Sequence, residues 1–178
     1  MNTRLIDVYV DVSGSMAGHK IQAVNRHLAL LFAEIGSLAT DVHLYAFAES
    51  TQRHRFSKSP NFKALRESTS FCALGDFVSS LQKASKNGSV MFIYSDSLSV
   101  NVEEEEQIER ISQQFQAAYP IRRGILVSHS KRQDGLVRSI CNAGTFGIDE
   151  DTGVVAASLF SSCRDAEKHE SQIIETKG

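Results

Sequence analysis

The sequence predicts an α/β fold in which a doubly wound, mostly parallel sheet is covered by helices on both faces. Apolar runs typical of buried strands alternate with segments whose apolar residues recur every three or four positions, as in amphipathic helices. The chain has 178 residues, and globular domains are typically about 100 to 200 residues long. No repeat or linker interrupts the alternation. We therefore expect one domain over 1–163, followed by a polar tail over 164–178 that frays.

The elements of this fold can be assigned in order along the chain. A continuous apolar run predicts the first strand, and apolar residues at helical spacing predict the first helix. Alternation of side chains along the chain predicts the second strand, with a short polar return strand beside it. Another stripe, a continuous apolar run and further strand and helix patterns complete the chain. The expected strands are 5–10, 41–47, 52–56, 90–94, 121–127 and 145–148, and the expected helices are 21–35, 74–81, 103–115, 136–140 and one beginning after 149–152.

Composition excludes several classes of function. The formal net charge of −2 and the pI near 6.3 argue against general attraction to nucleic acid, which needs a clustered basic surface. No apolar run approaches the roughly 20 residues needed to cross a bilayer, and the first residues lack a signal-peptide layout. We expect a cytoplasmic protein with no nucleic-acid or membrane partner. The three cysteines are expected to be small buried hydrophobes rather than disulfide partners.

A hydroxyl-rich turn after the first strand carries the strongest functional signal. Asp11, Ser13 and Ser15 place three oxygen donors on one bend, and Gly14 is expected to let the backbone turn sharply. Such oxygens suit Mg²⁺, Mn²⁺ or Ca²⁺, and no thiolate or imidazole cluster favours zinc. In an open α/β sheet, ligands bind at the carboxyl ends of the strands.

A second carboxylate, Asp96, follows the apolar strand 90–94 as Asp11 follows the first strand. If these strands are parallel neighbours, the two carboxylates share one sheet edge, where they repel each other unless a cation lies between them. The alternative is that both aspartates merely cap helices or order turns.

The pattern D-x-S-x-S resembles the metal-ion-dependent adhesion site of the von Willebrand factor A (VWA) family. In that family a loop threonine and an aspartate after a central strand complete the site, which implies Thr69 and Asp96 here, with Ser68 and Ser70 as alternatives to Thr69. Ser68 and Ser97 stand where family members commonly have glycine. The resemblance also implies a Rossmann-like sheet of about six strands, with the return strand 52–56 as its antiparallel edge.

The resemblance implies a function as well. In the family the two serines and the threonine coordinate the ion directly, the aspartates act largely through water, and an open coordination position accepts an acidic side chain of a protein partner. We expect the same here, with Mg²⁺, Mn²⁺ or Ca²⁺ as the ion. Loop residues expected at the rim of the site are His19, Ser97 and His129.

The chain is similar to small, stand-alone bacterial VWA proteins associated with tellurite resistance. That likeness implies an intracellular protein-interaction module whose partner belongs to a kinase, phosphatase or AAA ATPase system. We expect no catalytic activity.

Two other functions remain open. A Mg²⁺-dependent phosphohydrolase of the haloacid dehalogenase-like type also uses an aspartate after its first strand, but it needs a second acid two positions later, where this chain has Ser13. The second open function is that of a metal-independent scaffold with the same fold. A serine hydrolase is less favoured, because Ser13 and Ser15 lack a nucleophile-elbow context.

Overall fold

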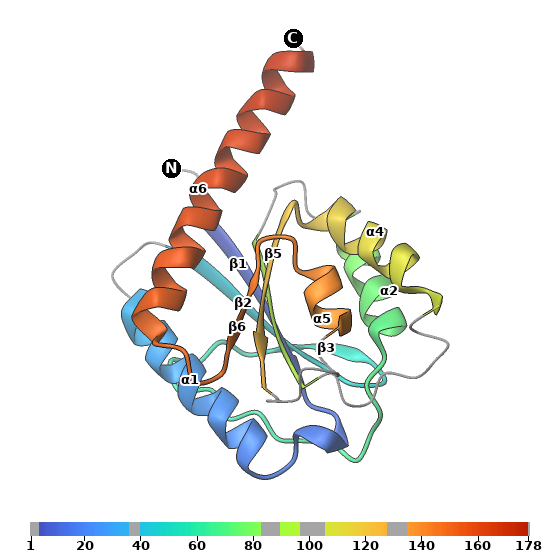
Figure 1. Ribbon diagram of the computed structural model, residues 1–178, viewed down its shortest axis with the longest axis vertical. Coiled ribbons are helices and arrows are strands. Elements are labelled where there is room, and N and C mark those ends of the chain that lie inside the picture. The colour runs from blue at the N-terminus through green and yellow to red at the C-terminus, as the bar shows by residue number, and fades with distance from the viewer. Residues whose placement is uncertain (1–3, 36–39, 83–89, 97–105, 128–134, 178) are drawn as a thin grey trace.

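The computed structural model describes residues 4–35, 40–82, 90–96, 106–127 and 135–177. It confirms the predicted α/β class, with strands and helices alternating along the chain (Figure 1). The strands are β1 Arg4–Asp11, β2 Thr40–Phe47, β3 Thr51–His54, β4 Val90–Ser95, β5 Ile121–Leu126 and β6 Thr145–Gly147. The helices are the 3-10 turn η1 Gly14–Met16, α1 His19–Ile35, α2 Phe71–Gln82, α4 Ile108–Ala118, α5 Gly135–Ile140 and α6 Thr152–Lys177.

The six strands form one sheet in the order β3-β2-β1-β4-β5-β6. Every neighbouring pair is parallel except β2 and β3, which are antiparallel, so β3 is the antiparallel edge strand that the sequence predicts. From β1 the chain first continues to β2 on one side and later returns to β4 on the other. The order of connection therefore reverses between β1 and β4, which is where open α/β sheets bind ligands.

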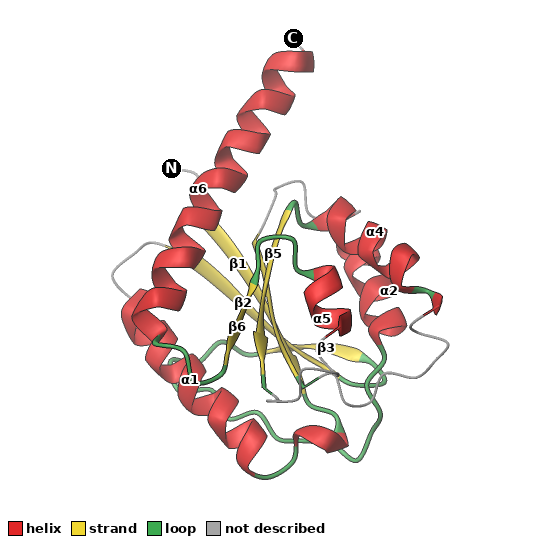
Figure 2. Ribbon diagram, in the orientation of Figure 1, coloured by secondary structure: helices red, strands yellow, loops and turns green. Residues whose placement is uncertain are grey.

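Helices cover both faces of the sheet (Figure 2). One face packs against α1 and α6, and the other packs against α2, α4 and α5. Alternation along β1 sends Val8 and Val10 to the first core and Tyr9 to the second. All six residues of β4 are buried, as expected for a strand covered on both sides.

The carboxyl-terminal segment differs from the prediction. Asp151 accepts the amides of Gly153 and Val154 at 2.9 and 3.2 Å and so caps the start of α6. From there α6 continues to Lys177, so residues 164–177, expected to fray as a tail, are helical. Figure 1 shows the second half of α6 projecting beyond the sheet. Because this half leaves the core, its sequence lacks the apolar stripe that predicts a helix.

Two further expectations can be compared with the structure. Cys141 and Cys163 are buried and Cys72 is partly buried, and these three cysteines are not joined by disulfides in the structure. Burial raises the pKa of the Cys141 thiol to about 12, so it behaves as a small apolar side chain. Within the described ranges, none of the helices is both long enough and apolar enough to span a bilayer.

Candidate metal centre

The five residues predicted for the site come together at the carboxyl ends of β1 and β4. Val10 of β1 lies opposite Tyr94 of β4, and each strand then has one more residue, Asp11 and Ser95 respectively. Asp11, Ser13, Thr69 and Asp96 are buried, and Ser15 is partly buried. The topology therefore brings residues 81 positions apart, such as Ser15 and Asp96, into direct contact.

The Asp11 carboxylate accepts hydrogen bonds from three separate segments, two through hydroxyls and one through a backbone amide. Its Oδ2 accepts a hydrogen bond of 2.6 Å from Ser95 Oγ, and its Oδ1 accepts the Ser13 amide at 2.9 Å. Thr69 Oγ1 lies 3.3 Å from both carboxylate oxygens. The side chain of Asp11 is thus fixed in orientation and has no exposed surface.

The hydroxyls of Ser13 and Ser15 link the turn that follows Asp11 to the second carboxylate, Asp96. Ser13 Oγ lies 3.1 Å from Ser15 Oγ, and Ser15 Oγ donates to Asp96 Oδ1 at 3.1 Å. The bend is closed by the Met16 amide, which donates to the Ser13 carbonyl at 3.0 Å, and the Met16 side chain is fully buried. Packing of Met16 in the core therefore anchors the turn from which Ser15 reaches Asp96.

Gly14 lies in the sharp turn where it is expected, but its backbone is not left-handed. It lies in the 3-10 turn η1, and the glycine of this loop with a left-handed backbone is Gly18, at φ 76°. A Cβ on Gly14 would lie 3.4 Å from the carbonyl oxygen of Leu65 and 3.7 Å from that of Glu67. Both distances are ordinary van der Waals contacts, so a Cβ at Gly14 would fit beside the segment that carries Thr69.

That segment, residues 60–70, has no regular secondary structure but is bound to the site by its backbone. The Leu65 amide donates to the Val12 carbonyl at 2.6 Å, and the Gly14 amide donates to the Glu67 carbonyl at 2.9 Å. Farther along α1, the Asn25 side chain both donates to and accepts from the backbone of Phe62, at 2.9 and 2.8 Å. These bonds fix the position of Thr69 without a helix or a strand.

The structure distinguishes Thr69 from its two serine neighbours. Ser68 is exposed. Ser70 Oγ accepts the Ala73 amide at 3.1 Å, which is the contact of an N-cap residue at the start of α2. Of these three hydroxyls, Thr69 is therefore the one directed at Asp11.

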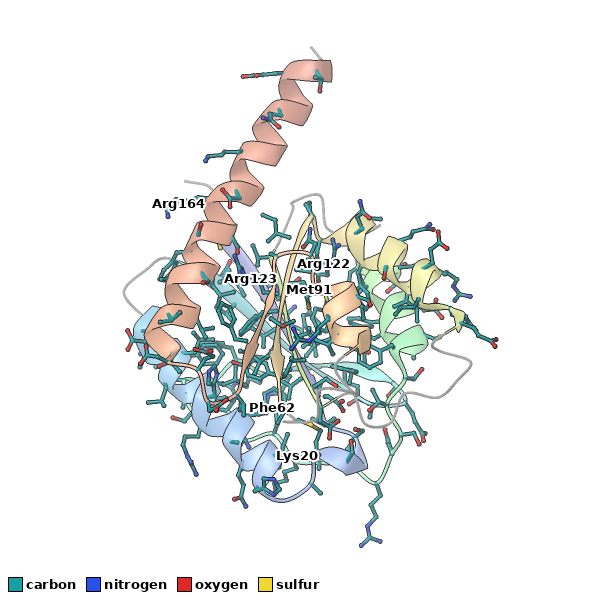
Figure 3. The ribbon with its side chains drawn as sticks, in the orientation of Figure 1. Lys20, Phe62, Met91, Arg122, Arg123 and Arg164 are labelled. Carbon is teal, nitrogen blue, oxygen red and sulfur yellow. The ribbon has the colours of Figure 1, made fainter. Side chains whose placement is uncertain are left out.

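Two residues of the site were missed by sequence reasoning. Ser95 donates to Asp11, and Lys20 Nζ lies 2.8 Å from Asp96 Oδ2 in an ion pair. Ser95 could have been found from the parallel register, because it is the residue opposite Asp11. Lys20 carries no comparable signal, since a lysine between a turn and a helix is usually a solvated charge. Figure 3 labels Lys20 near the start of α1, toward the opposite end of the sheet from Arg122.

The electrostatics of Asp11 favour a cation. Burial raises the pKa of its carboxyl above the ordinary value, and the negative charge of Asp96 raises it further. Hydrogen bonds from Ser95 and Ser13 stabilise the charged form and act in the opposite direction. A positive charge beside the two carboxylates would relieve both the desolvation and the repulsion.

The donor set fits a hard divalent ion. Ligand oxygens at about 2.0 to 2.1 Å from an octahedral Mg²⁺ lie roughly 3 Å from their neighbours. The spacings Ser13 Oγ to Ser15 Oγ and Ser15 Oγ to Asp96 Oδ1 are both 3.1 Å. Among the described residues no group of three or more His, Cys, Asp or Glu side chains could hold a metal ion.

The simpler interpretation of Asp11 also describes part of the structure. Its contact with the Ser13 amide, two residues on, is that of an aspartate that orders a turn. Turn ordering does not account for the second carboxylate, or for the hydroxyls of Thr69 and Ser95 directed at Asp11.

The expected rim is described only in part. His19 is exposed and is the first residue of α1, next to Lys20. Ser97 and His129, also expected at the rim, lie outside the described residues. The exposed residues Leu65, Arg66 and Ser68 belong to the segment 60–70 that borders the turn at Gly14.

No protein-family model matches the chain, and no curated protein matches it in sequence. Its fold is similar to the crystal structure of an aerotolerance-related membrane protein from Bacteroides fragilis NCTC 9343 with multiple mutations to serines. The TM-score is 0.62 at 10% identity, over 91% of this chain and 99% of that one. A second similar structure is the conserved hypothetical protein BatB from Bacteroides thetaiotaomicron, with TM-score 0.62 and 10% identity over 90% of this chain and 99% of that one. At such identity the likeness concerns the fold alone.

Proposed function

We propose that this chain is a VWA-type protein-interaction module that binds a divalent cation and uses it to capture an acidic residue of a protein partner. One observation carries the proposal. Two buried carboxylates and three hydroxyls from β1, η1, the segment 60–70 and the end of β4 converge at the point where the strand order reverses. In accordance with the VWA resemblance, Ser13, Ser15 and Thr69 would hold the ion directly, and Asp11 and Asp96 would hold it through water.

The chain's own residues prepare this site for a cation. Ser95 and the Ser13 amide orient Asp11, while Met16 anchors the turn that presents Ser13 and Ser15. A bound Mg²⁺ supplies an open coordination position for a carboxylate oxygen, because Mg²⁺ prefers six oxygen ligands and neutral hydroxyls leave its charge partly uncompensated.

The neighbouring surface suits a protein partner. Leu65, with 45% of its surface exposed, and the exposed Arg66 lie on the segment that borders the turn at Gly14. An apolar anchor beside a site for an acidic side chain is a common arrangement for recognising a short protein segment. From the sequence resemblance we propose a cytoplasmic protein of bacterial type whose partner belongs to a kinase, phosphatase or AAA ATPase system.

The phosphohydrolase alternative is less well supported. Its nucleophile must reach a substrate, yet the Asp11 side chain has no exposed surface and contacts Ser95, Thr69 and the Ser13 amide. Ser13 also stands where that class of enzyme needs its second acid. Both observations support a module without catalytic activity.

Peptide selection from a random display library, in Mg²⁺ and in EDTA, tests the proposal. We expect enrichment of sequences that contain Asp or Glu in Mg²⁺ only, and loss of that enrichment in Ser13→Ala. The matched control is Ser80→Ala, which removes an exposed hydroxyl of α2. Equal enrichment in EDTA and in Ser13→Ala would favour the metal-independent scaffold, and Mg²⁺-dependent hydrolysis of a phosphate monoester abolished by Asp11→Asn would favour the enzyme.

A further inference from the structure

We propose that Lys20 is a built-in cation that neutralises Asp96 when no divalent ion is bound, and that a divalent ion must displace the Lys20 ammonium to occupy the site. Lys20 would then set the threshold concentration at which the site loads. This inference rests on the proposed function, because it concerns how the same site acquires its ion.

The ion pair is close and well shielded. Lys20 Nζ lies 2.8 Å from Asp96 Oδ2, the Lys20 side chain is 17% exposed, and that of Asp96 is fully buried. A lysine that only decorates a surface keeps its ammonium in water. Here the ammonium is directed inward to a carboxylate that the site needs.

The backbone gives Lys20 this direction. Gly18 adopts a left-handed φ of 76° and its carbonyl accepts the Gln22 amide, so α1 begins immediately after the turn. Ile21, the next residue, is buried in the core and fixes the rotation of the helix. Lys20 is thereby placed at the carboxyl end of β4 rather than on the outer face of α1.

The two oxygens of Asp96 have different partners. Oδ1 accepts the hydroxyl of Ser15, which belongs to the proposed ion site, whereas Oδ2 accepts the ammonium of Lys20. A divalent ion beside Ser15 would place a second, larger positive charge within a few ångströms of that ammonium. Like charges at such a separation repel strongly when water is excluded. Binding of the ion and retention of the ion pair therefore oppose each other.

A purely structural ion pair would behave differently. It would stabilise the fold, but its removal would leave the affinity for metal unchanged or reduced. Displacement predicts the opposite sign, because removal of the ammonium eliminates a competitor for Asp96. The sign of the change in metal affinity thus separates the two roles.

The test is titration of the EDTA-stripped protein with Mn²⁺, comparing the wild type with Lys20→Met. Met keeps most of the length of the side chain and removes its charge. We expect Lys20→Met to bind Mn²⁺ at least about 5-fold more tightly than the wild type. Lys20→Arg, which retains the charge, should stay near the wild-type affinity, and Lys58→Met, which removes an exposed lysine charge, is the matched control.

Thermal unfolding provides a second readout. In EDTA, Lys20→Met should unfold at a lower temperature than the wild type, because Asp96 loses its counter-charge. Saturating Mn²⁺ should then raise the unfolding temperature more in Lys20→Met than in the wild type.

The outcomes separate this inference from the proposed function. If Lys20→Met binds Mn²⁺ saturably with an affinity equal to or weaker than that of the wild type, displacement is overturned, but the proposed metal-dependent function is not. Absence of Mn²⁺ binding in both proteins overturns the module and displacement together. If Lys20→Met does not fold, the Lys20 Cε and Hε chemical shifts of the wild type are followed by NMR during a Mg²⁺ titration. A shift that saturates with binding supports displacement, and unchanged shifts at saturation overturn it.

Discussion

Asp7 and Asp11 lie four residues apart on β1 and point to the same face of the sheet. Both are buried, with 5% and 0% of their surfaces exposed, and burial raises the pKa of both carboxyls above 3.8. They differ in their neighbours. This difference separates an aspartate that belongs to the core from one that belongs to a site.

Asp7 is compensated by side chains of the sheet interior. Tyr119 donates its hydroxyl to Asp7 Oδ2 at 2.7 Å, and the Tyr119 hydroxyl is also 2.5 Å from that of Tyr9. His43 Nδ1 lies 3.3 Å from Asp7 Oδ1. Tyr9 also stacks on Tyr45, with ring centroids 4.8 Å apart. The groups nearest to Asp7 are thus aromatic and imidazole rings rather than small hydroxyls.

Asp11 lies at the strand end, among small hydroxyls and beside a second carboxylate. Ser95 and Asp96, which follow one another at the end of β4, and Thr69 of the segment 60–70 meet Asp11 at this edge of the sheet. Burial of a carboxylate is therefore not what marks the site. The second carboxylate and small oxygen donors at the point of strand reversal distinguish Asp11 from Asp7.

The largest effect is expected from Asp11→Asn. Its affinity for Mn²⁺ should fall roughly 100-fold, because the ion loses one of its two compensating carboxylates. Asp7→Asn should stay within about threefold of the wild type, since Asp7 shares no partner with the site. Electron paramagnetic resonance of free Mn²⁺ measures both affinities. An equal loss in the two variants would remove the distinction between the aspartates.

Asn25→Ala tests whether the irregular segment presents Thr69. It removes both side-chain bonds to the backbone of the buried Phe62, which should lower the free energy of unfolding by about 1 to 3 kcal/mol. Mn²⁺ affinity should also fall, by roughly 10-fold, because Thr69 is held less firmly. Urea unfolding and Mn²⁺ titration measure these effects. Arg26→Ala, at an exposed position of α1, is the control and should change neither quantity.

Tyr119→Phe acts on the other aspartate. Loss of the hydroxyl removes a donor from the buried Asp7 carboxylate, and the free energy of unfolding should fall by about 1 to 2 kcal/mol. Mn²⁺ affinity should not change. In the Asp7→Asn background the same substitution should cost less, because no charged acceptor remains. A weakened Mn²⁺ site in Tyr119→Phe would contradict the separation of the two regions.

A smaller effect concerns pH. Because the pKa of Asp7 is raised by burial, the folded protein holds a proton just above pH 3.8 that the unfolded chain has released. The contribution of Asp7 to stability is therefore present below pH 3.8 and is lost as pH rises through its raised pKa. Asp7→Asn should lack this loss, so its free energy of unfolding relative to the wild type should increase with pH. Urea unfolding in EDTA over the acidic range measures this, and a constant difference would contradict it.

The sequence alone was sufficient for the fold and for part of the site. Periodicity predicts the alternating elements, and Asp11, Ser13 and Ser15 are adjacent on one turn. The parallel pairing of β1 and β4 confirms that the strand ends followed by Asp11 and Asp96 meet at one edge. The prediction of Thr69 depended on the family resemblance. Backbone hydrogen bonds hold the segment 60–70 in place, and such bonds leave no periodic pattern in the sequence.

The remaining features could not be predicted from the chain. Ser95 and Lys20 act through contacts with residues at least 76 positions away, and of the two only Ser95 can be located from the strand register. The length of α6 was missed because apolar residues recur at helical spacing only where one face of a helix is buried. The second half of α6 projects beyond the body of the molecule (Figure 1).

The most direct test of the account is isothermal titration of the EDTA-stripped protein with Mg²⁺ and Mn²⁺. Wild type and Ser80→Ala should bind one ion saturably, and Ser13→Ala should bind it much more weakly, because Ser13 is one of the three residues proposed to hold the ion directly and its Oγ lies 3.1 Å from that of Ser15. Absence of binding to the wild type, or equal binding by Ser13→Ala, would contradict the claim that the residues between β1 and β4 form a metal centre.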